Sequence, residues 1–120
     1  MSDITTKADV QRLVETFYGK LVIDPLIGKF FEGLDLEHHL PRIRAFWEMA
    51  LLNVPGYTTN VTEVHLKLHQ RIPMEKAHFD RWLELFRATV DDLFSGPNAE
   101  EAKLRALSIA AVMLVKVQRT

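Results

Sequence analysis

His65 and His69 have helical spacing and are the side chains of this sequence best suited to hold a metal ion. Residues four apart project from the same face of a helix, so the pair resembles half of a helical zinc site. The glutamate of an HExxH motif is missing, however, because Leu66 follows His65, and no third ligand has a recognisable spacing. A zinc enzyme is therefore disfavoured, and the question becomes which of the two histidines, if either, binds something.

Other common site chemistries lack their motifs. Ser2, Ser95 and Ser108 fall in a tail, a loop and a helix, and none has the elbow motif of a serine nucleophile. The segment GKFFEG has its glycines too far apart for a phosphate loop and lacks the Lys-Ser/Thr pair. Cysteine is absent, which excludes disulfides, thiolate metal sites and thiol nucleophiles together and fits a reducing compartment.

Four side chains, Tyr18, His39, Trp47 and Trp82, combine an apolar body with a polar tip on otherwise apolar segments. Polar tips that point into an apolar helical core predict a cofactor pocket. The alternative is that Tyr18 and Trp82 are large core residues whose O–H and N–H find backbone partners. The residues by themselves leave both readings open.

Amphipathic segments would position these side chains, and the spacing of their apolar residues indicates helix each time. The predicted helices cover residues 10–22, 38–52, 61–71, 79–93 and 98–117, with a short helical piece, PLIGKFF, after the first. No segment alternates like a strand, no repeat is visible and no linker divides the chain. The sequence therefore predicts an all-α protein with a single domain over residues 1–120.

Prolines and capping residues mark the ends of these helices. The first helix stops at Asp24-Pro25, and Pro41 places the start of the next close to His38, because proline is tolerated near a helix start. Asn98 and Glu101 have the spacing of a capping box for the last helix. The apolar positions of that helix are Leu104, Leu107, Ala111, Leu114 and Val117.

Charge and hydropathy limit the partners. Fifteen Lys and Arg against sixteen Asp and Glu give a net charge of −1, with both signs interspersed, so no basic stripe invites nucleic acid or anionic lipid. No apolar run approaches the ~20 residues that span a bilayer, and the N-terminus MSDITTKADV lacks the apolar core of a signal peptide. We expect a cytoplasmic protein, a monomer or weak dimer, without nucleic-acid or membrane partners.

Several sequence pieces, taken in order, resemble one family. FY at residues 17–18, DPLIGKFF, HHLPRIRAFW, LHQRIP, HFDRWLELF and TVDDLFSGP followed by AEEAK are similar to segments of the group III truncated haemoglobins. The resemblance covers the chain from near residue 10 to near residue 115. It implies a shortened globin fold, a two-over-two helical sandwich, closed over haem b (iron protoporphyrin).

The resemblance also selects between the two histidines. In this family the histidine that binds the haem iron stands about ten residues before the Phe of an HF-x-x-W segment, and a Pro commonly follows it by four. His69 has Phe79 and Pro73 at those distances, whereas His65 would need a gap. His69 is therefore the predicted proximal ligand, and its second ring nitrogen can donate to the carbonyl of His65, one turn back.

On the other face of the haem, the resemblance places the ligand-binding residues Tyr18, Trp82, His39 and Ile43. The Tyr18 O–H and the Trp82 N–H are donors for the partly negative outer atom of bound O₂. Whether His39 donates to the ligand or acts as a gate stays open, since Pro41 can redirect the first turn of its helix. The wider pocket residues implied are Phe30, Phe31, Phe46, Tyr57 and Arg71.

One segment departs from the family pattern. Relatives commonly have a loop like GxYxGNP before the proximal helix, whereas NVPGYTTNV keeps adjacent Gly and Tyr and lacks the Gly-Asn-Pro. The contacts of Tyr57 and Arg71 with the haem propionates are therefore the least supported of these expectations.

The function implied is binding of O₂, NO and CO at a five-coordinate ferrous iron. Hydrogen-bonding donors favour O₂ and NO chemistry, such as NO dioxygenation or a peroxidase-like reaction, over O₂ delivery or transport, and this chemistry would need an external reductase. Two alternatives remain: a ligand sensor or storage globin without turnover, and a helical interaction module without a cofactor.

Overall fold

The computed structural model describes residues 1–33, 35–55 and 74–119, with the backbone alone for 117–119. These residues form α1 (Lys7–Ile23), the short 3₁₀ helix η1 (Gly28–Phe31), α2 (Leu36–Leu52), α4 (Lys76–Leu93) and α5 (Pro97–Arg119). No strand occurs in the described part of the chain. The predicted helix at 61–71 lies outside the described residues.

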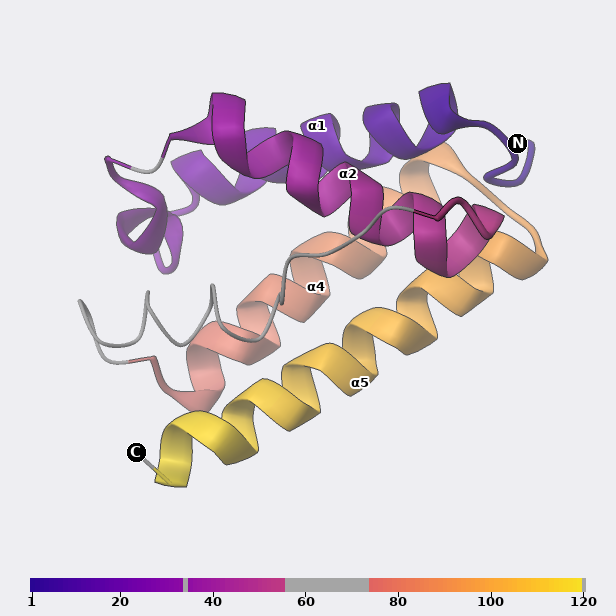
Figure 1. Ribbon diagram of the computed structural model, residues 1–120. Helices are drawn as coiled ribbons and strands as arrows, with labels where there is room; N and C mark the ends of the chain where they lie inside the picture. Colours follow the sequence, from indigo (N-terminus) through magenta and orange to yellow (C-terminus); the bar gives the residue numbers. More distant parts are fainter. Residues whose placement is uncertain (34, 56–73, 120) are drawn as a thin grey trace.

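The helices form two pairs, one above the other (Figure 1). α1 and α2 make one layer, α4 and α5 make the other, and α1 also packs against α4. Helices in such layers bury one apolar stripe each, and the shared core is lined by aromatic residues of α1, η1, α2 and α4. The predicted two-over-two sandwich is confirmed.

The first helix follows its sequence signals closely. Thr6 and Asp9 form a reciprocal capping box: the Asp9 N–H donates to the Thr6 hydroxyl (3.1 Å), and the Thr6 N–H donates to the Asp9 carboxylate (3.0 Å). The helix ends at Asp24, which precedes Pro25, as predicted. The buried face of α1 carries Val10, Leu13, Val14, Phe17, Tyr18 and Leu21.

The second helix starts earlier than predicted. Asp35 caps it by accepting the Glu37 N–H (3.1 Å), so α2 begins at Leu36 rather than close to His38. Pro41 consequently lies inside the helix, where it has no N–H to donate to the carbonyl one turn back. The register still aligns His39, Ile43, Trp47 and Leu51 on the buried face.

The last helix differs from its prediction in two respects. Its N-terminus is capped from the far end of the chain, because the Asn98 and Ala99 N–H groups donate to Asp3 (2.9 and 2.8 Å). The expected capping box of Asn98 and Glu101 is therefore wrong. The buried face consists of Ala99, Ala102, Ala106, Ala110 and Met113, whereas Leu104 and Leu107 are exposed. Small side chains let this part of α5 lie close to the core, while Leu104 and Leu107 face outward.

No described helix has both the length and the apolar character required to cross a bilayer.

Candidate functional site

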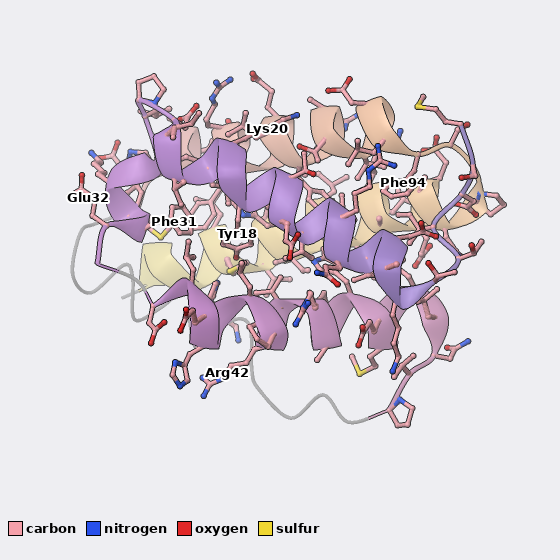
Figure 2. All side chains as sticks on the ribbon, turned by 90° about the horizontal axis from the view of Figure 1, so that it is seen from above. Tyr18, Lys20, Phe31, Glu32, Arg42 and Phe94 are labelled. Carbon is pink, nitrogen blue, oxygen red and sulfur yellow. The ribbon has the colours of Figure 1, made fainter. Side chains whose placement is uncertain are left out.

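Tyr18 of α1 and His39 of α2 face each other in the core, with 2.9 Å between the phenol oxygen and Nε2. In Figure 2 the Tyr18 side chain lies between these two helices. The two rings meet edge to face, with centroids 5.3 Å apart. Burial raises the pKa of Tyr18 above its usual value of 10, so the phenol keeps its proton at neutral pH.

Trp82 of α4 approaches the same region from the opposite layer. Its ring meets Phe17 of α1 edge to face at 5.6 Å and stacks on Phe86 with centroids 5.9 Å apart. The indole nitrogen is buried. Phe31 of η1 reaches the Tyr18 ring from the side, at 5.8 Å.

A small cavity of about 20 Å³ lies among these side chains, which is room for a molecule about the size of water. Apart from the Tyr18 hydroxyl and the indole N–H groups of Trp47 and Trp82, the side chains that line it are apolar. The lining residues are Phe17, Tyr18, Ile43, Phe46, Trp47, Trp82 and Ile109. Every long described helix therefore contributes to one enclosed space with few polar tips.

The structure brings most of the predicted distal residues together. The cavity is lined by four of them, Tyr18, Ile43, Phe46 and Trp82. His39 is hydrogen-bonded to the Tyr18 hydroxyl. Phe30, expected in the pocket, instead packs edge to face on His78 with centroids 4.8 Å apart, in line with its place in the core. His69, Tyr57, Arg71 and His65 lie outside the described residues.

Sequence reasoning missed two parts of this region. Phe17 and Ile109 line the cavity, although neither was given a place in the pocket from the sequence. Asp24 was interpreted only as a stop signal for α1, yet its side chain is 2% exposed and accepts a hydrogen bond from Arg81 Nε on α4 (2.9 Å). The Arg81 guanidinium, opposed by the effect of burial, holds the pKa of Asp24 below its usual value.

The described residues do not supply a bare metal site. Among residues 1–33, 35–55 and 74–116, no three His, Asp or Glu side chains cluster as ligands for an ion. What this region offers instead is an aromatic enclosure with a phenol, an imidazole and an indole at its edge. Such a lining suits a largely apolar guest with one small polar end.

Comparison with known proteins points to one family. The family model of bacterial-like globins matches residues 2–115. The chain is similar to the group III truncated haemoglobin of Campylobacter jejuni, with 25% identity over 98% of this chain and 95% of that one, and a TM-score of 0.84. No curated protein sequence gives a significant match.

Two further solved structures share the fold. The 2/2 haemoglobin of Synechococcus sp. PCC 7002, solved in the cyanomet state with covalently attached haem, has a TM-score of 0.76 at 20% identity, covering 95% of this chain and 93% of that one. THB1 of Chlamydomonas reinhardtii has a TM-score of 0.67 at 24% identity, covering 91% and 87%. The resemblance inferred from the sequence pieces is thus confirmed.

Proposed function

The chain belongs to the bacterial-like globins, which bind haem and diatomic gases, and on that premise we propose that it uses its gas site for chemistry, either NO dioxygenation by retained O₂ or a peroxidase-like reaction, rather than for O₂ delivery. Haem is the expected cofactor. When bound, it supplies an iron that binds O₂, NO or CO and exchanges electrons with them.

The described residues fit this cofactor. A porphyrin needs an apolar enclosure, and a gas ligand needs a few donors beside it. Phe31, Ile43 and Phe46 are aromatic or aliphatic residues close to Tyr18 and its cavity, which supports their assignment to the haem pocket. In the proposal His69 is the iron ligand, with Tyr57 and Arg71 near the propionates.

The observation that carries the proposal is the buried pair of Tyr18 and His39 beside the cavity that Trp82 also lines. A neutral imidazole has its proton on either ring nitrogen. With the proton on Nε2, His39 donates to the Tyr18 oxygen, and the Tyr18 O–H is left to donate to the ligand. With the proton on Nδ1, Tyr18 donates to His39 instead. The tautomer of His39 therefore decides how strongly Tyr18 holds O₂.

Retention favours chemistry over delivery. A hydrogen bond to a strongly polarised group contributes roughly 1.5–3 kcal/mol, so two donors slow O₂ release by on the order of a hundredfold or more. O₂ held for that long has time to meet NO and yield nitrate. Because the bound cofactor would supply one electron to such a reaction, an external reductase would have to return it.

The iron assignment has its own test. We expect His69→Ala to abolish stable haem retention, or to weaken it so that added imidazole, which replaces the missing ligand, restores it. His65→Ala, the matched control four residues earlier, should keep the ferrous spectrum nearly unchanged. The measurement is the Soret band of both variants after expression with ample haem. Loss of haem in the His65 variant alone would shift the proximal assignment by one turn. A wild-type protein without a Soret band would favour the cofactor-free helical module.

The distal donors are tested by Tyr18→Phe and Trp82→Phe, which each remove a donor and keep an aromatic body. O₂ dissociation should become faster by about tenfold to a hundredfold in the Tyr18 variant, and also faster in the Trp82 variant. CO carries less charge on its outer atom and should respond less. Stopped-flow mixing measures both rates. Unchanged O₂ release in both variants would remove the case for ligand chemistry and leave storage or sensing.

A further inference from the structure

Asp24 is the most completely bonded buried carboxylate in the described part of the chain. One oxygen, Oδ1, accepts from Arg81 Nε at 2.9 Å and lies 2.8 Å from Arg81 Nη2. The other, Oδ2, accepts from the Leu26 and Ile27 N–H groups at 3.0 and 3.1 Å. Each oxygen thus has its own partners, so the carboxylate cannot turn without breaking bonds on both sides.

These bonds join the two layers of the fold next to the candidate site. Asp24 ends α1, six residues after Tyr18, and Arg81 directly precedes Trp82 on α4. The Asp24 side chain also accepts the N–H of Ile27, the residue directly before η1, and so helps to hold η1 in place. Phe31 of η1 contacts the Tyr18 ring. The Asp24–Arg81 pair therefore lies between the two elements that carry the proposed donors.

The other described contacts between these elements are mainly apolar. Phe17 meets Trp82 and Phe86 edge to face, and Phe30 meets His78 in the same way. Apolar contact is non-directional, so it permits small shifts along a helix, whereas a charged Arg–carboxylate contact has defined geometry. A second ion pair between α1 and α4, Lys20 with Asp92, is longer at 3.5 Å and more exposed. The Asp24–Arg81 contact is therefore the more sharply defined of the two polar links between these helices.

We propose that Asp24 and Arg81 are positioning residues that hold the Tyr18 hydroxyl and the Trp82 indole at the separation that lets both reach one ligand. This inference rests on the proposed function, because it assigns the pair a role only toward those two donors. It predicts that weakening the pair changes ligand behaviour although neither residue lines the cavity.

The main variant is Asp24→Asn, which keeps a side-chain oxygen for the Leu26 and Ile27 N–H groups and removes the charge that holds Arg81. We expect the infrared C–O stretching band of the ferrous CO form to shift or split, since that band reports the donors around the ligand. O₂ release should become faster by about three- to tenfold. The double variant Asp24→Asn with Arg81→Gln should show no further change, because both substitutions break the same contact between α1 and α4.

The matched control is Asp80→Asn, the same chemical change one residue before Arg81. Asp80 is exposed and pairs with Lys76 at 2.7 Å. Its variant should keep the wild-type band and the wild-type O₂ release. Arg81→Lys gives a second route if Asp24→Asn folds poorly: it keeps the positive charge and loses the planar geometry, so a smaller shift of the band is expected.

The outcomes separate the two claims. If Asp24→Asn and Arg81→Lys lower the melting temperature but keep the wild-type band and O₂ release, the pair is a structural brace and the inference is wrong. If Tyr18→Phe, measured in the same series, also moves neither quantity, the proposed donor role fails instead. If the infrared band or O₂ release changes in Tyr18→Phe and also in Asp24→Asn, but not in Asp80→Asn, both the donor role and the positioning role are supported.

Discussion

The two ends of the helical frame are held by different kinds of hydrogen bond. At the pocket end, defined by Tyr18, Asp24, His39 and Arg81, side chains of different helices bind one another. At the clamp end, defined by Ser2–Ile4 and Ser95–Ala99, the Asp3 carboxylate accepts backbone N–H groups. Figure 2 shows Phe31 near the first end and Phe94 near the second.

The clamp end has no visible alternative arrangement. The Ser95 N–H donates to the Ser2 carbonyl at 3.0 Å, and the Asn98 side chain donates to the Ile4 carbonyl at 2.7 Å. Gly96 has φ 143°, and a Cβ there would lie 2.6 Å from the Asp3 carboxyl carbon. The chain therefore needs both a small residue and an acid at this place.

The pocket end differs because two of its groups, Tyr18 and His39, can change partners. The Tyr18 O–H can bind His39 or a ligand, and the His39 proton can occupy either nitrogen. Substitutions of Tyr18 or His39 should therefore alter ligand chemistry more than stability, and those at the clamp end should do the reverse. This contrast is what the following variants break or sharpen.

The larger effect is expected from Asp3→Ala. It removes both acceptors of the α5 N-terminus, and a lost cap together with a charged hydrogen bond costs about 2 kcal/mol of the free energy of unfolding. O₂ release and the infrared band should stay at wild-type values, since Asp3 does not line the cavity. Urea unfolding and stopped-flow mixing measure the two quantities.

Asp3→Asn is the companion variant, because it retains one oxygen acceptor and should lose less stability than Asp3→Ala. Gly96→Ala should resemble Asp3→Ala, since its Cβ displaces the same carboxylate. A change in O₂ release in any of these three variants would show that the two ends are coupled and would end the contrast.

The helices themselves were largely predictable because their signals are local. Thr6 with Asp9 and Asp24 with Pro25 lie within one turn of the ends that they mark. The cap of α5 could not be predicted from local signals, since Asp3 lies 95 residues from Asn98. Asn98 has the right type and spacing for a cap, but Pro97 already begins the helix.

The buried face of α5 shows a second limit. Residues 106–115 carry no charge, so apolar spacing cannot tell one face from another. Leu104 is 60% exposed, while Ala102 and Ala106 are fully buried, so the N-terminal half of α5 buries its small side chains rather than its leucines. Side-chain size at a packed interface depends on the facing helix, which a single segment does not reveal.

The candidate site was predictable where a polar tip interrupts an apolar face. Tyr18 and Trp82 stand out in this way, and the structure places both on one cavity. The Asp24–Arg81 contact joins residues 57 apart, and each residue has an ordinary local explanation, one as a stop signal and the other as a surface cation. Pairing across layers therefore escaped the sequence pattern.

A change of pH should have a smaller effect on the free energy of unfolding than Asp3→Ala, and this effect involves His78 at the start of α4. This imidazole is buried, its Nδ1 accepts the Glu75 N–H at 2.8 Å, and its ring packs on Phe30. Burial, and then the charge of Lys29, lowers the pKa of His78 below its usual 6.5, against an opposing effect of Glu75. Protonation of Nδ1 would also break its bond to the Glu75 N–H.

The direction of the pH effect follows from that lowered pKa. As pH falls, the unfolded chain takes up the proton before the folded chain does, so the contribution of His78 to stability is complete above pH 6.5 and is lost below it. Asp3 behaves differently in this range. Burial would raise its pKa, but the N–H groups of Asn98, Ile4 and Ala99 together hold it below 3.8, so the clamp stays charged.

We therefore expect acidification from about pH 7.5 to about pH 5.5 to weaken the start of α4, where His78 packs on Phe30, and to leave the clamp end charged. His78→Gln keeps an acceptor for the Glu75 N–H without a titrating ring, so its free energy of unfolding should fall less steeply than that of the wild type. The difference for one proton is at most about 1.4 kcal/mol per pH unit. Urea unfolding at both pH values measures it, and Asp3→Ala, which keeps His78, should retain the wild-type slope. Equal slopes in the wild type and His78→Gln would mean that His78 carries no pH dependence, and a flattened slope in Asp3→Ala would place it at the clamp end instead.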